Sequence, residues 1–275
     1  MNKLNKDKRI QVIGALVEGN SVRATCRMTG VAKGTVLTLL ADVGQACAEY
    51  HDRVMHNVKS RRVQCDEIWS FCYAKEKNVP KEMQGRYGVG DVYTWTAIDA
   101  DTKLAISWLV GRRGASYARS FIADLASRLA NRVQLTTDGY RVYLDAVEGA
   151  FGCEVDYATL VKLYGEDRSE EVRYSPAKCI GAQAALISGR PDPRHISTSF
   201  VERQNLTMRM SMRRFTRLTN AFSKKIENLV HAVALHFMHY NFCRIHQSLR
   251  VTPAMEASLT DHVWTIHDLI AILEV

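Results

Sequence analysis

The order of strand-like and helix-like segments is the feature that most constrains the fold of this chain. Residues 63–73, 92–98 and 104–110 alternate in period two, which is typical of strands, and short turn-forming segments join them. Residues 115–128 have the apolar stripe of an amphipathic helix, and a short strand follows at 133–137. Three adjacent strands predict an antiparallel meander, and the helical crossover makes the fourth strand parallel to the first. The sequence therefore predicts an α/β fold with a mixed sheet flanked by helices.

Composition excludes several other classes of protein. Of 275 residues, 47% are hydrophobic and 24% charged, the usual mix of a protein with a packed core and not of a disordered or collagen-like chain. No apolar run approaches the roughly 20 residues that span a bilayer, and no apolar core follows the basic start, as a signal peptide requires. The seven cysteines are scattered without a Cys-x-x-Cys pair, so free thiols in a reducing cytoplasm are expected.

Positive charge is concentrated in two blocks. The net charge is +8, with eleven Lys and Arg against five Asp and Glu in residues 1–65. Residues 203–225 hold seven Lys and Arg and no acid, so the rest of the chain is slightly acidic. Localised basic blocks favour binding to a phosphate backbone, and solvated helix faces are the alternative.

The first basic block contains three short helical segments. The first ends at Gly19-Asn20, Ser21 caps the second, and the third opens at Lys33 after a turn at Thr29-Gly30. This pattern predicts a helix-turn-helix whose third helix enters the major groove, with Val31 and Val36 packed inward. A plain helical bundle is the alternative. A separate polar helix is expected over 41–57, followed by a basic linker at 59–62.

Two aspartates are associated with the predicted sheet. Asp66 lies in a strand otherwise suited to burial, where an unpaired carboxylate is costly, and Asp138 stands at the tip of the fourth strand, where α/β sites gather. The alternative for Asp66 is a solvent-facing side chain, with Glu67 as the unusual buried residue. The alternative for Asp138-Gly139 is a plain turn, and a turn also accounts for Asp99 and Asp101.

A third carboxylate, Glu202, precedes the second basic block. Ser199-x-x-Glu202 has the spacing of a capping box, which offers a purely structural explanation. Arg209, at i+7 from Glu202, shares its helix face, and positive charge continues beyond it without an acid. A carboxylate at the head of a cationic helix suits a place where metal ions and phosphates meet. The residues expected to contact DNA are Lys33, Thr35, Thr38, Arg61, Arg62, Arg203, Arg209, Arg213, Arg214 and Arg217.

Three motifs in this order resemble the catalytic core of DDE transposases, in particular an IS1-like insertion-sequence family. They are the segments 65–73, 136–140 and 200–209, and 240–254 resembles an ending common to several transposases and integrases. The resemblance covers about residues 60–255. It implies an RNase H-like core with a five-stranded mixed sheet. It assigns the metal-binding acids to Asp66, Asp138 and Glu202, and a basic residue two turns after the glutamate to Arg209.

The resemblance also implies an activity. Such enzymes use two Mg²⁺ ions, for which Mn²⁺ can substitute, to free a 3′-hydroxyl at an element end and join it to target DNA. The expected partner is double-stranded DNA, bound by a homodimer or higher oligomer in the cytoplasm at the nucleoid, with no membrane involved. A nuclease or resolvase that cuts without joining, and a domesticated DNA-binding regulator, are the alternatives.

The chain is expected to divide into three parts. They are a helix-turn-helix domain over 1–58, a catalytic domain over 59–255 and a helical tail over 256–275. Residues 141–198 exceed the compact spacing of many relatives and predict an insertion with a polar surface loop from 162 to 176. The head lacks the Cys-rich zinc finger that often accompanies the family, so its DNA recognition is expected to differ.

Overall fold

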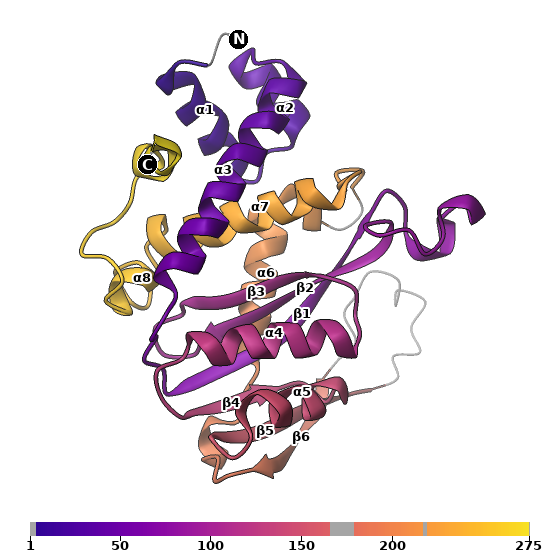
Figure 1. Ribbon diagram of the computed structural model, residues 1–275, viewed down its shortest axis with the longest axis vertical. Helices are drawn as coiled ribbons and strands as arrows, with labels where there is room; N and C mark the ends of the chain where they lie inside the picture. The colour runs from indigo at the N-terminus through magenta and orange to yellow at the C-terminus, as the bar shows by residue number, and fades with distance from the viewer. Residues whose placement is uncertain (1–3, 166–178, 217–218, 275) are drawn as a thin grey trace.

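Six strands form one mixed sheet at the centre of the molecule, as the computed structural model shows (Figure 1). The structure describes residues 4–165, 179–216 and 219–274. The strands are β1 (Arg62–Cys72), β2 (Gly90–Asp99), β3 (Ala105–Gly111), β4 (Val133–Thr137), β5 (Val155–Tyr164) and β6 (Cys179–Ser188). The predicted α/β class with a mixed sheet is confirmed.

The strand order is β3-β2-β1-β4-β5-β6. β1, β2 and β3 form the predicted antiparallel meander, and β4 pairs parallel to β1 as expected. β5 runs parallel to β4, and β6 returns antiparallel to β5 as a sixth strand. The predicted surface loop from residue 162 is therefore wrong at its start, because residues 162–164 belong to β5. The rest of that loop, from 166 on, lies outside the described residues.

Helices cover both faces of the sheet (Figure 1). On one face lie α4 (Ala115–Arg128), which matches its predicted bounds, and α5 (Val142–Phe151). On the other lie α6 (Ser199–Ser211) and α7 (Ile226–Met238). Trp95 of β2 packs against Phe121 of α4 and Tyr143 of α5, whereas Trp108 of β3 stacks on Phe237 of α7. These aromatic contacts hold the two helical layers onto the sheet.

Alternation along β1 decides which way its acids point. Val63 and Cys65 belong to the core cluster that contains the α4 and α5 side chains, and Ile68 and Cys72 belong to the cluster with α6 and α7. Each fully buried apolar side chain contributes about 1.5–3 kcal/mol, and a one-residue slip would exchange the faces. The even-numbered side chains of β1, including Asp66, therefore point toward α6.

Helices α1 (Lys6–Val17) and α2 (Val22–Thr29) form the head with the first turns of α3 (Lys33–Val54). Ser21 caps α2 as predicted, its hydroxyl accepting from the amide of Ala24 at 3.1 Å, and Gly30 adopts φ 71° at the turn. Val31 and Val36 are buried as expected.

The prediction of a separate helix from residue 41 is wrong, because α3 is one helix of 22 residues. Its buried residues keep helical spacing across the expected break: Val36, Leu39, Leu40, Val43, Gly44, Cys47 and His51. α3 thereby runs from the head into the layer beside α7, where Gly44 lies directly against His231. The missing side chain of Gly44 permits this close helix crossing.

The C-terminal part contains a π-helical turn at His239–Cys243, α8 (Pro253–Glu256) and α9 (Ile266–Ala271). Leu269 and Ile270 of α9 share a core cluster with residues of α1, so the tail returns to the head. No helix in the described part of the chain is long and apolar enough to cross a membrane.

Candidate active site

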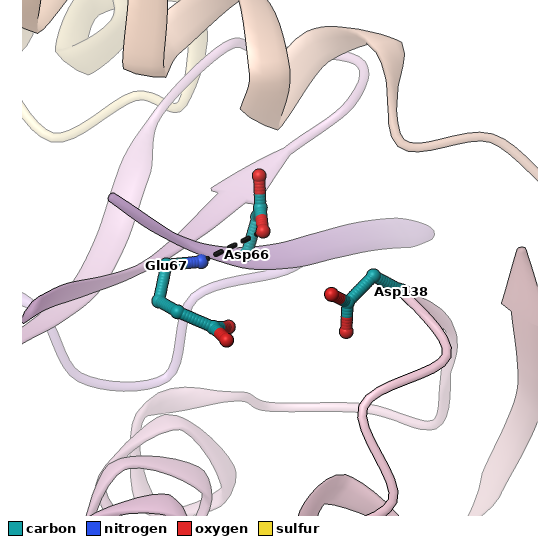
Figure 2. A group of neighbouring side chains, drawn as sticks. All are labelled: Asp66, Glu67 and Asp138. Atoms are coloured by element: carbon teal, nitrogen blue, oxygen red, sulfur yellow. Dashed lines mark hydrogen bonds between the residues drawn. The ribbon is translucent and has the colours of Figure 1, made fainter. Parts of the chain in front are cut away.

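Asp66 and Asp138 lie side by side where β4 ends. The last pair of the parallel ladder between β1 and β4 is Cys65 with Thr137, and each aspartate is the next residue along the chain. β1 continues past this point, whereas β4 stops, so the carboxylates meet at the end of the shorter strand (Figure 2). The sheet thus joins two acids that are distant in sequence.

A third carboxylate, that of Glu67, completes this cluster. Asp66, Glu67 and Asp138 each offer one oxygen, and these oxygens all lie within 4.8 Å of one another. Figure 2 shows the side chains of Asp66 and Glu67 leaving β1 in different directions, with Asp138 beside both. Sequence reasoning identifies Glu67 only as an unusual buried residue and not as a member of the site. The signal that could have identified it is a second acid beside Asp66 in the same buried strand.

Glu67 is held on the α4 and α5 face. Its side chain is 2% exposed, its Oε1 accepts from Nε of Arg113 at 2.6 Å, and its Oε2 accepts from the Tyr143 hydroxyl at 2.9 Å. Burial and the charge of Asp138 raise the pKa of Glu67, and Arg113 opposes that rise. One of the three acids therefore already has a cationic partner.

Asp66 has no cationic partner among the described residues. Its Oδ1 accepts from the amide of Glu67 and its Oδ2 from Nδ2 of Asn205 on α6, both at 2.8 Å. Burial raises the pKa of the Asp66 carboxyl to about 7, with further increases from the charges of Glu67, Asp138 and Glu202. Desolvation and like charges disfavour the ionised form, and a bound cation would relieve both.

Glu202 lies on α6 and is engaged with other partners. Its Oε1 accepts from the Thr198 hydroxyl at 2.6 Å, and its Oε2 forms an ion pair with Nζ of Lys162 on β5. It is not among the three residues whose oxygens all lie within 4.8 Å. The capping-box interpretation is wrong, because α6 starts at Ser199 after Thr198 as N-cap and no side chain caps it. Its charge nevertheless contributes to the raised pKa of Asp66.

The donor set suits a hard divalent cation. All the candidate ligand atoms are carboxylate oxygens, which Mg²⁺ and Mn²⁺ prefer, and the cluster carries more negative charge than Arg113 neutralises. Asp66 and Asp138 could hold one ion between them. The ion pair between Lys162 and Glu202 shows that the Glu202 carboxylate also accommodates a positive charge.

Asp99, the last residue of β2, and Asp101 form a turn, as expected. Asp99 accepts from the backbone amides of Asp101 and Thr102, and Asp101 forms ion pairs with Arg61 and Arg62. Both arginines were predicted to contact DNA. Arg62 is held in this network, whereas the side chain of Arg61 is largely exposed.

The other predicted DNA contacts lie on two elements. Lys33, Thr35 and Thr38 are exposed in the first turns of α3. On α6, Arg203 is exposed and Arg209 half-buried. The predicted cationic helix ends earlier than expected, because α6 stops at Ser211.

Beyond α6, Arg213 and Arg214 occupy a short 3-10 helix, and Arg217 lies outside the described residues. An open cavity of about 720 Å³ joins the head to this region. Five cations and no acid are among its described lining residues, the cations being Arg23, Lys33, Arg213, Arg214 and Lys224. Burial lowers the pKa of Arg214, which pairs with no described carboxylate. The cavity is therefore suited to an anionic partner.

Comparisons with known proteins give distant structural likenesses. No protein-family model matches the chain, and no curated protein matches it. Among solved structures, a piggyBac transposase synaptic complex with hairpin DNA is 9% identical, with 99% of this chain and 71% of that chain covered and a TM-score of 0.43.

Two complexes of Mos1 are also similar. The Mos1 strand transfer complex is 13% identical over 56% of this chain, with a TM-score of 0.24, and the Mos1 mariner paired end complex with Mn is 14% identical over 56%, with a TM-score of 0.23. The matches cover 59% and 60% of those two chains, less than two thirds of their length.

Proposed function

We propose that this chain is a DNA transposase of the DDE type, IS1-like and with an RNase H-like core, whose catalytic acids are Asp66, Asp138 and Glu202. The observation that carries the proposal is the meeting of Asp66, within β1, and Asp138, where the parallel strand β4 ends, beneath a helix that carries Glu202. Three sequence motifs that resemble those of DDE transposases thus supply one acid each, from a strand, a strand tip and a helix.

The acids would hold two Mg²⁺ ions, or Mn²⁺ in their place. Asp66 would contribute to both, with Asp138 at one ion and Glu202 at the other. When bound, the ions lower the pKa of the attacking water or hydroxyl and stabilise charge on the phosphate. Lys162, now paired with Glu202, would exchange that carboxylate for a phosphate oxygen of the DNA.

Glu67 is the rival for the third position, because its oxygen lies nearer the two aspartates in the described arrangement. We assign it instead to holding Arg113, since both its oxygens already accept hydrogen bonds on the opposite face. Glu67→Gln and Glu202→Gln separate the two assignments. Loss of cleavage in Glu67→Gln alone would transfer the third position to Glu67.

Charge placement supports DNA as the partner. The cavity between the head and α7 is lined by Lys33, Arg213 and Arg214, without an acid in its described lining. We infer that the head binds element ends as a helix-turn-helix and that the cavity guides the phosphate backbone toward the acids. Joining two ends needs two active sites, so the working form would be a homodimer or higher oligomer on DNA.

The decisive experiment is a strand-transfer assay with the full chain, Mg²⁺, a plasmid target and labelled duplex DNA from the flanks of its coding sequence. The expected result is joined product with the wild type and none with Asp66→Asn, Asp138→Asn or Glu202→Gln. All three variants should retain DNA binding in a gel-shift assay. Nicking without joining would favour a nuclease or resolvase, and binding without metal-dependent nicking would favour a regulator.

A further inference from the structure

Asn205 is a buried amide that meets the candidate site from α6. It is 8% exposed, and its Nδ2 donates to Oδ2 of Asp66 at 2.8 Å. It follows Glu202 by three residues, a spacing that places both on one side of the helix. α6 therefore brings a carboxylate and an amide to the same region of β1.

The oxygen of this amide has no partner. Oδ1 of Asn205 is buried and accepts no hydrogen bond from any described residue. An ionised Asp66 can only accept, so the amide must turn its NH₂ group toward the carboxylate, which leaves the oxygen directed elsewhere. A buried acceptor without a donor costs about 1–3 kcal/mol, and most buried polar groups in proteins are paired.

Packing alone does not account for an amide at this position. The neighbouring residues that α6 buries against the sheet include the apolar Val201 and Met208, and a leucine at 205 would fill a similar volume without an unpaired oxygen. Gln204, the adjacent buried amide, lies within hydrogen-bond distance of Nε2 of His236, at 3.3 Å. Asn205 differs because its Nδ2 donates to the Asp66 carboxylate, whereas its Oδ1 has no described donor.

We propose that Asn205 is a positioning residue of the acid site, holding the Asp66 carboxylate through Nδ2 in the orientation that binds the divalent ion. This inference rests on the proposed function, because it requires that Asp66 binds such an ion. The unpaired Oδ1 is then the consequence of placing an amide donor on Asp66. The Nδ2 contact fixes the orientation of Asp66, as outer-shell partners of metal sites do for the ligands.

The test uses the full chain without DNA and Mn²⁺ alone as the probe. Electron paramagnetic resonance gives the dissociation constant from the free Mn²⁺ signal and the symmetry of the site from the bound spectrum. Asn205→Leu is expected to weaken Mn²⁺ binding at least about tenfold and to alter the bound spectrum. Gln204→Leu, the same substitution one residue earlier, is expected to leave both unchanged.

Asn205→Ala, which removes the same groups without adding bulk, replaces Asn205→Leu if thermal unfolding shows that leucine prevents folding. Wild-type affinity in a folded Asn205 variant, or an equal loss in Gln204→Leu, would overturn the role of Asn205 and leave the proposed function standing. No Mn²⁺ binding by the wild type, or undiminished binding by Asp66→Asn, would overturn the proposed function as well.

Discussion

Asp66 and Glu67 are neighbours on β1 whose side chains serve opposite faces of the sheet, yet an oxygen of each lies within 4.8 Å of the other and of Asp138. This is possible because β4 ends at Thr137, so Asp138 stands at the edge between the two faces. Arg113 neutralises Glu67, but Asp66 is left with hydrogen bonds alone. Without a cation, the burial of these like charges therefore lowers the stability of the folded chain.

Asp66→Asn should stabilise the ion-free protein at pH 8. The folded-state pKa of the Asp66 carboxyl is raised to about 7 from its ordinary 3.8. The free energy of unfolding therefore falls as the pH rises from about 3.8 to about 7, because the carboxyl ionises more readily in the unfolded chain. The cost amounts to at most about 4 kcal/mol above pH 7, and the variant should recover between about 1 and 4 kcal/mol. Denaturant unfolding in EDTA at pH 5 and pH 8 measures this difference.

The exposed Asp145→Asn is the control and should change stability by less than about 0.5 kcal/mol at either pH. Added Mn²⁺ should stabilise the wild type and not Asp66→Asn. Equal stability of Asp66→Asn and the wild type at pH 8 would contradict the charge conflict at this site.

Glu67→Gln should shift the pH dependence of Mn²⁺ binding to lower pH. The charge of Glu67 is, after burial, the next cause that raises the pKa of Asp66, and glutamine keeps the size of the side chain without that charge. The affinity should rise with pH through about 7 in the wild type and through a lower range in the variant. Titrations from acidic to mildly alkaline pH measure the midpoint, and the exposed Glu76→Gln should leave it unchanged.

Gly44→Ala should weaken the packing of α3 on α7. A Cβ at this position would lie 2.5 Å from Cβ of His231 and 2.6 Å from its carbonyl oxygen, so the helices must separate. The expected loss is about 1–3 kcal/mol. Gly14→Ala in α1 meets nothing within 4 Å and should instead add about 0.5–1 kcal/mol. Thermal unfolding should show a lower stability than the wild type for Gly44→Ala and a higher stability for Gly14→Ala. Wild-type stability of Gly44→Ala would refute the close crossing of α3 and α7.

Lys33→Gln and Arg213→Gln should each weaken DNA binding uniformly across sequences. Both residues line the cationic cavity, and removing one cation that binds a phosphate should reduce the slope of log affinity against log salt by about 1. Fluorescence anisotropy with labelled duplexes over a salt range of roughly 50–200 mM measures this slope. Lys77→Gln, exposed on the β1–β2 connection, should keep the wild-type slope.

Local sequence signals predicted most elements well. The bounds of α4 and β4, the cap at Ser21 and the meander of β1 to β3 follow from periodicity and turn residues, which act over a few positions. The break expected in α3 was wrong, because no local signal shows that α7 will cover its apolar stripe. The N-cap expected for α6 at Ser199 was wrong by one residue. Thr198 is the N-cap, and its hydroxyl donates to the Glu202 carboxylate.

The amino-acid sequence by itself determined the strands β1 to β4 and the helix α4, and it placed Asp66 in a buried strand and Asp138 at a strand tip. Tertiary structure alone decided which acids share one site. Pairing of Cys65 with Thr137 brings the aspartates together, while Lys162 engages Glu202 and Arg113 engages Glu67. The physical reason is that these contacts depend on sheet register and helix placement between distant segments, whereas propensity and periodicity report only on neighbours along the chain.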